Sequence, residues 1–157
     1  MNRFYVEEGN KQISVLRYFD AVSVTAHVIR ILPEKNDFRE SELYFEFLDF
    51  YRVSRINFLE FSKPGGYARI QALLGKEPEE PWTQEDRSAF TGAYYAFKNA
   101  YYAAGGSQLP ITVGDAMLAY LEIYGYPSLR GKHGQELKKE LAKVWEEITL
   151  QQEDAPI

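Results

Sequence analysis

The stretch AFTGAYYAFKNAYYAAGG, residues 89–106, places six aromatic rings within eighteen residues and ends at a glycine pair. Such a density of rings suits either a stacking platform for a ligand or the buried side of a helix. At about 100° per residue, an α-helix here gathers most of the rings on one broad apolar stripe. That stripe contains Phe90, Ala93, Tyr94, Phe97, Ala100, Tyr101 and Ala104. Because this spacing is typical of a packed helix face, we predict that these residues belong to the core.

The two remaining rings, Tyr95 and Tyr102, lie seven residues apart on a separate stripe beside Lys98. Tyrosine is enriched at protein interfaces because it buries a large area and keeps a polar tip. We therefore predict that Tyr95, Lys98 and Tyr102 form a partner-binding site. Two alternatives stay open: the rings stack on a small ligand, or they lie against an N-terminal sheet with their hydroxyls at the solvent edge.

A third stripe of the same helix carries only small residues, Gly92, Ala96 and Ala103. Small side chains allow a neighbouring backbone to come close. We expect a second helix or a strand to pack closely against this stripe.

Much of the sequence before residue 76 has the pattern of extended structure, apart from YARIQALLG (67–75), which predicts a short helix closed by Gly75. RFYVEE and QISVLRYF flank Gly9-Asn10, a pair that accepts positive φ, which predicts a hairpin. The segment AVSVTAHVIRIL, residues 21–32, alternates apolar and polar side chains and predicts a strand. Residues 41–63 fit either a strand or a helix, and their aromatic content favours strands.

The second half of the chain has helical signals. Thr83 and Thr112 are predicted N-caps, with Asp86 in the capping-box position after Thr83. A last helix from about residue 135 places Leu137, Leu141, Val144, Trp145 and Ile148 on one stripe. Strands followed by helices favour an α+β fold. We predict a single domain over 1–157, in which an N-terminal antiparallel β-meander packs against about three C-terminal helices. Its β-rich part spans 1–76, its helical part 82–152, and KEPEEP (76–81) is linker-like.

Composition excludes several classes of protein. The chain has no cysteine, which excludes disulfides, thiolate nucleophiles and cysteine metal sites. Residues 1–76 carry 11 basic and 10 acidic side chains, whereas residues 77–157 carry 7 basic and 13 acidic ones. This distribution argues against duplex nucleic acid as a partner. No apolar run has the length of a membrane span or a secretion signal, so we expect a cytoplasmic protein without a membrane partner.

Two basic glycine loops precede predicted helices, where free backbone N–H groups attract anions. SKPGGYAR (62–69) offers Lys63 and Arg69. SLRGKHGQ (128–135) offers Arg130, Lys132 and His133. Each loop is a candidate phosphate or carboxylate site, the first with Lys63 and Arg69 and the second with Arg130, Lys132 and His133. Neither loop matches a phosphate-loop or dinucleotide motif, and both also fit ordinary turns beside helices.

Catalytic and metal signals are sparse. His27 and His133 are the only histidines and lack a partner at metal-ligand spacing. Asp49 is the best candidate for a general acid, because a strand would turn it toward apolar neighbours. Without a catalytic motif, we assign no catalytic, metal or cofactor site.

These features favour a small non-catalytic protein that acts through another protein. It would be an inhibitor, an immunity or adaptor protein, or an accessory component of a larger assembly. A phage or mobile-element origin is one of the possibilities. The first alternative is an enzyme or sensor for a small anionic ligand held at a glycine loop. The second alternative is binding of single-stranded nucleic acid through stacked tyrosines.

Overall fold

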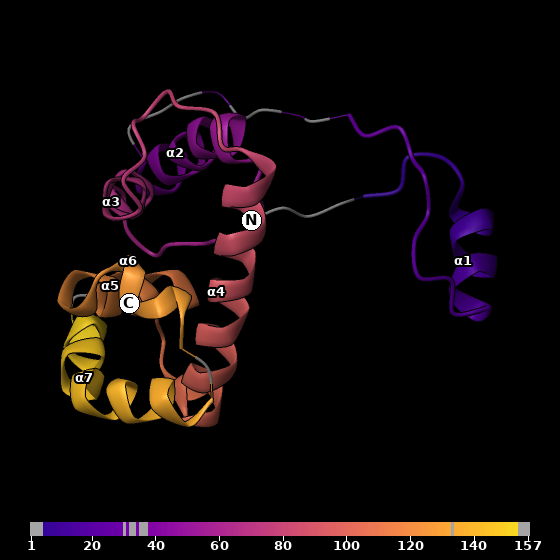
Figure 1. Cartoon of the computed structure of the whole chain (residues 1–157). Helices are drawn as coiled ribbons and strands as arrows, with labels where there is room; N and C mark the ends of the chain where they lie inside the picture. The colour runs from indigo at the N-terminus through magenta and orange to yellow at the C-terminus, as the bar shows by residue number, and fades with distance from the viewer. Residues whose placement is uncertain (1–4, 30, 32–33, 35–37, 133, 154–157) are drawn as a thin grey trace. The chain divides into compact units, whose positions relative to one another are not determined.

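The computed structural model describes residues 5–29, 31, 34, 38–132 and 134–153, and these residues form helices and loops without a strand (Figure 1). The predicted α+β fold with an N-terminal β-meander is therefore wrong. The chain divides into two compact units, residues 1–34 and 35–157. Residues 76–81, expected to be linker-like, lie inside the second unit.

The first unit contains one helix, α1 (Asn10–Tyr18), among its described residues. The predicted hairpin at Gly9-Asn10 is wrong because Gly9, with φ of 92°, begins this helix. The carbonyl of Gly9 accepts the N–H of Ile13 at 3.0 Å. Residues 21–29, expected to form a strand, are neither helix nor strand, and no described side chain between 5 and 29 is buried.

The second unit begins with α2 (Arg39–Ser54), where aromatic content had favoured a strand. Helical spacing buries Leu43, Phe47 and Phe50 on one side of α2, whereas Asp49 is exposed. The preference of aromatic residues for strands depends on what packs against them. Here the core lies along one side of the segment, so the helical period prevails. Asp49 consequently faces water and not the apolar neighbours that a strand would have supplied.

Next come α3 (Gly66–Leu73) and α4 (Gln84–Ala103), the aromatic helix. The predicted capping box at Thr83 is confirmed: its hydroxyl accepts the N–H of Asp86, whose carboxylate accepts the N–H of Thr83. The predicted core assignment is confirmed for the rings of Phe90, Tyr94, Phe97 and Tyr101, all buried. The helix ends just before Gly105, which has φ of 96°, and the 3-10 turn η1 (Gly106–Gln108) follows.

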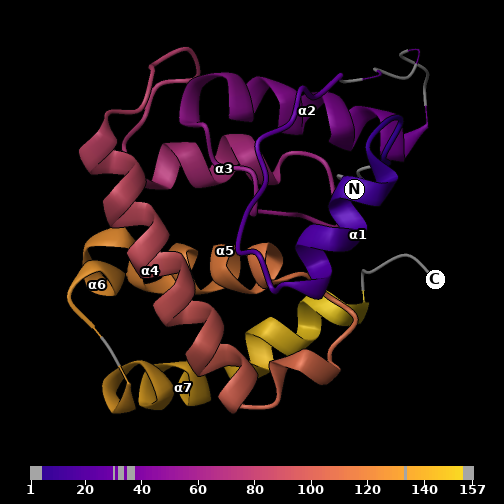
Figure 2. The ribbon, with the colours of Figure 1, turned by 90° about the vertical axis from the view of Figure 1, so that its right-hand side faces the viewer.

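The chain ends with α5 (Val113–Tyr124), α6 (Tyr126–Arg130) and α7 (Gln135–Glu153). Helix α5 is apolar on nearly every side and contacts α3, α4, α6 and α7. In Figures 1 and 2 it lies between the α2–α3 pair and α7, with α4 along one side. Helix α7 buries its predicted stripe at Leu137, Leu141, Val144 and Ile148, with Trp145 partly buried.

The N-terminus of α5 joins the α2–α3 part of this unit to the rest. Thr112 and Asp115 form a capping box. The Thr112 hydroxyl also donates to the carbonyl of Glu60 at 2.6 Å. The Asp115 carboxylate accepts the N–H of Ser62 at 3.1 Å. These two residues therefore cap α5 and hold the loop between α2 and α3 at the same time.

The expected close packing is absent at Gly92, where nothing in the described part of the chain lies within 4 Å of an added Cβ atom, and at the exposed Ala103, whereas Ala96 packs against the core. The close approach occurs instead at Gly114 in α5. A Cβ atom there would collide with the carbonyl oxygen of Glu60. Helix α5 packs directly on this backbone, which only glycine permits.

These two glycines make a matched pair of tests. We expect Gly114→Ala to lower the free energy of unfolding by about 3 kcal/mol or more, because a backbone carbonyl cannot move aside cheaply. Gly92→Ala should raise it by roughly 0.5–1 kcal/mol, because alanine is the better helix former on an open face. Urea denaturation followed by circular dichroism measures both. Equal effects of the two substitutions would contradict the packing of α5 on residue 60.

Candidate functional site

Tyr95, Lys98 and Tyr102 form a continuous row on the exposed side of α4, which we call the tyrosine–lysine row. Both tyrosines are 44% exposed. The Lys98 ammonium lies 5.8 Å from the ring centroid of Tyr95 and 5.5 Å from that of Tyr102. At these distances the cation is attracted to both ring faces. Lys98 therefore lies between the two rings predicted from the sequence.

The row is supported from behind by other rings. Tyr95 contacts Phe58 and Tyr94, each with a centroid distance of 5.4 Å. Tyr102 lies 5.9 Å from the ring of Tyr101. The alternative in which the tyrosines lie against an N-terminal sheet is wrong, because the described residues form no sheet. The rings are instead half-exposed and held by aromatic neighbours.

Phe58 is a member of this surface that sequence reasoning missed. It precedes the loop residues held by Thr112 and Asp115 and packs on Tyr94 at 4.7 Å. A strand prediction for 41–63 concealed its position. The spacing within α4 offered no signal for it, since the contact joins residues far apart in the chain.

The buried tyrosines behind the row have no acid–base role near neutral pH. Burial raises the pKa of Tyr94 to about 12, and it does the same for Tyr101. Both hydroxyls therefore stay protonated. The Tyr94 hydroxyl donates to the carbonyl of Phe58 at 3.4 Å, a long contact that orients the ring.

The first glycine loop is filled by the protein's own carboxylates. Gly65, the residue before α3, donates its N–H to both oxygens of Glu46 at 2.9 and 2.7 Å. Arg69 pairs with Glu122, and Lys63 also interacts with a neighbouring group. The helix N-terminus does attract an anion as the sequence suggested, but that anion is Glu46.

The second glycine loop is used in a similar way. Lys132 forms an ion pair with Glu140 and donates to the hydroxyl of Ser128 at 2.9 Å. The hydroxyl of Tyr120 also donates to Glu140, and these hydrogen bonds, led by the one from Lys132, lower the pKa of Glu140. Arg130 lies 6.0 Å from the ring centroid of Tyr126. His133 lies outside the described residues. Among the described residues of the two loops, Arg69 and Lys132 are each paired with a carboxylate of the chain itself.

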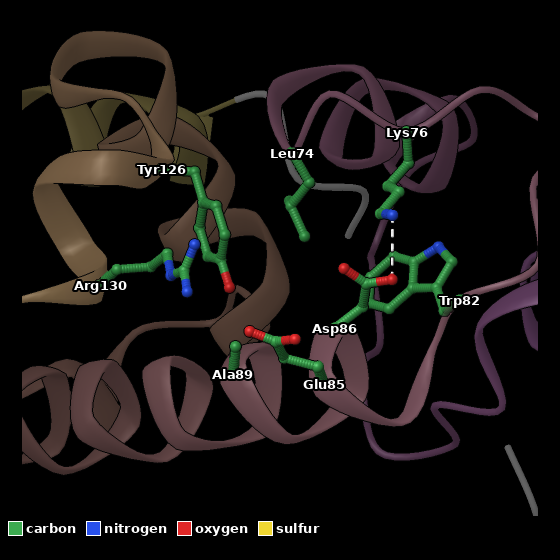
Figure 3. Close-up of a pocket in the computed structure, with 8 residues that line it drawn as sticks. All are labelled: Leu74, Lys76, Trp82, Glu85, Asp86, Ala89, Tyr126 and Arg130. Carbon is green, nitrogen blue, oxygen red and sulfur yellow. Dashed lines mark hydrogen bonds and ion pairs between the residues drawn. The ribbon is translucent and has the colours of Figure 1, made fainter.

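A small pocket lies between α4 and α6 in this unit (Figure 3). Figure 3 shows Glu85 and Asp86 of α4 on one side and Tyr126 and Arg130 on the other. Its volume is about 80 Å³, whereas ligand pockets usually measure roughly 300–1,000 Å³. Lys76 at its edge is held by Asp86 at 2.9 Å and Glu80 at 2.7 Å. The pocket has room for a few water molecules only.

Neither a metal site nor a membrane helix emerges from the described residues. No group of three His, Asp or Glu side chains is placed to hold a metal ion in this part of the chain. None of the helices described there has the length and apolar character that crossing a membrane requires. No protein-family model, curated protein or solved structure matches the chain.

The pairing of Asp86 predicts a pH dependence of stability. Its hydrogen bonds from Lys76, then from the backbone and hydroxyl of Thr83, lower its pKa to about 2. A carboxylate with a lowered pKa contributes stability above its ordinary pKa of about 3.9 and loses it as the pH falls toward 2. We expect the wild type to lose more stability than Asp86→Asn between these values, as measured by urea denaturation at several pH values. Parallel pH profiles for the two proteins would contradict the assignment.

Proposed function

We propose that this protein acts without catalysis, by binding another protein through the tyrosine–lysine row of α4. The observation that carries the proposal is a lysine fixed between two half-exposed tyrosines on a helix whose opposite side is core. Its biological role would be that of an inhibitor, an immunity or adaptor protein, or an accessory component of an assembly.

The physical character of the row supports protein binding over ligand binding. Phe58, Tyr94 and Tyr101 hold the rings from behind, so little side-chain freedom remains to be lost when a partner covers them. Tyrosine anchors of this kind often dominate interface energetics. None of the three residues of the row lines the small pocket, so the row suits the surface of a partner protein better than a small ligand held in that pocket. Lys98 would favour a partner that presents a carboxylate or a backbone carbonyl opposite the two rings.

The anionic-ligand alternative loses physical support. An incoming phosphate would have to displace Glu46 from the N-terminus of α3, or Glu122 and Glu140 from their cations. Each displaced carboxylate would lose a charge-assisted hydrogen bond. We therefore propose protein binding alone.

The test compares tagged wild type with Tyr95→Ala/Tyr102→Ala. A partner is first isolated by affinity purification from the source cells and then purified, so that its dissociation constant can be measured by calorimetry. We expect the double variant to weaken binding at least about 30-fold, since each truncated anchor typically costs more than 1 kcal/mol.

Two controls accompany this measurement. Ile123→Ala removes a side chain that is 50% exposed on α5, and it should leave affinity unchanged. Tyr95→Phe/Tyr102→Phe keeps the rings and removes the hydroxyls, so most of the affinity should remain. If the alanine variant binds as tightly as the wild type, the row is not the binding surface.

A further inference from the structure

The N-terminal segment, residues 5–29, leaves its apolar side chains exposed to an unusual degree. Nine large apolar residues in this segment are exposed, compared with four among the described residues after 37. Within residues 21–29 they are Val22, Val24, Val28 and Ile29. In and beside α1 they include Val15, Tyr18 and Phe19. No described side chain of residues 5–29 is fully buried within this unit, so its exposed apolar residues are candidates for burial against another surface.

The exposed apolar area is large enough to support a stable interface. These nine side chains together expose on the order of 1,000 Å², given the area that an aromatic or branched side chain contributes. A stable interface buries roughly 800 Å² on each partner. The segment therefore carries enough apolar surface for an interface of standard size.

The order of residues in 21–29 makes the segment complementary to itself. Val22, Val24, Ala26 and Val28 alternate with Ser23, Thr25 and His27. If two copies run antiparallel with Thr25 opposite Thr25, Val22 meets Val28 and Val24 meets Ala26. Val22, Val24, Ala26 and Val28 then share one face, and the other face carries Ser23, Thr25 and His27 with Ala21 and Ile29 at its ends. The described part of a single chain contains no strand to offer such a pairing, so it requires two chains.

Helix α1 supplies a cover for the apolar face. Two paired strands alone are only marginally stable in water. Ile13 and Leu16, half-buried on α1, lie on one side of that helix with Val15 and Phe19 nearby. Two such helices, one from each copy, would provide the second layer.

We propose that this protein forms a homodimer in which the N-terminal segment of one copy pairs with that of a second copy about Thr25. Self-complementarity favours a second copy over an unrelated protein, because a two-fold axis presents the same patch on both sides. Charge agrees with this choice. Residues 1–34 hold four basic and four acidic side chains, whereas the whole chain has a net charge of −5. Because the segment has no net charge, two copies of it can pair without the electrostatic repulsion that acidic surfaces would cause.

The first test is the oligomeric state of the full chain, measured by light scattering and ultracentrifugation. We expect a mass near twice 18.2 kDa that falls upon dilution. Val22→Glu places a carboxylate without a cationic partner opposite Val28 on the apolar face and should raise the dimer dissociation constant at least about tenfold. Ser23→Glu introduces the same charge one residue along, on the polar face, and should leave the dimer intact.

The second test determines the alignment and uses the absence of cysteine in the chain. Thr25→Cys should form a disulfide between two copies under mild oxidation, because the two residues 25 face each other. Ala21→Cys should not, because residue 21 faces Ile29 of the other copy. Since the segment contains no buried side chain, each variant should unfold at the same urea concentration as wild type when measured as monomer.

Three outcomes would overturn the dimer. They are a wild type that is monomeric at every concentration, equal dissociation by the two charge variants, or equal cross-linking at residues 21 and 25. A monomeric wild type would show that the segment does not pair with a second copy of this chain. The result is separable from the proposed function, because Tyr95→Ala/Tyr102→Ala should leave the dimer mass unchanged.

Discussion

The hydrogen bonds at the N-terminus of α5 join the parts of the second unit. Thr112 and Asp115 cap the helix and also bind the carbonyl of Glu60 and the N–H of Ser62. Gly114 allows α5 to approach that backbone closely. An apolar helix must be covered on its apolar sides, and the loop between α2 and α3 covers the N-terminal end of α5. These hydrogen bonds hold that loop, and with it the α2–α3 pair, against α5.

The tyrosine–lysine row is a consequence of how α4 is used. One side of α4 packs into the core through Phe90, Phe97 and its other buried rings. Because α4 packs into the core on one side only, Tyr95 and Tyr102 remain accessible on another side. The loop held by α5 also brings Phe58 against Tyr95. The core rings and the tyrosine–lysine row therefore share the same helix, and the buried rings hold the exposed ones in place.

The two glycine loops show how far sequence reasoning about a site reaches. The expectation that a helix N-terminus would attract an anion agrees with the hydrogen bonds from Gly65 to Glu46. Glu46 belongs to another helix, so its arrival at that N-terminus is a tertiary event that local spacing does not contain. The same holds for Glu140 beside Lys132. In contrast, the arrangement of Tyr95, Lys98 and Tyr102 lies within one helix and follows from its periodicity.

The sequence by itself determined the helices whose apolar residues repeat with the helical period and whose ends carry caps. Thr83 and Thr112 mark two of these starts, and Leu137 and Leu141 belong to the stripe of the last helix. Only the tertiary structure decided residues 39–54, where an aromatic-rich pattern fits both periods and the position of the core selects the helix. It also decided residues 21–29, whose alternation is typical of a strand. A strand exists only with a neighbour to bond to, and the described part of one chain supplies none.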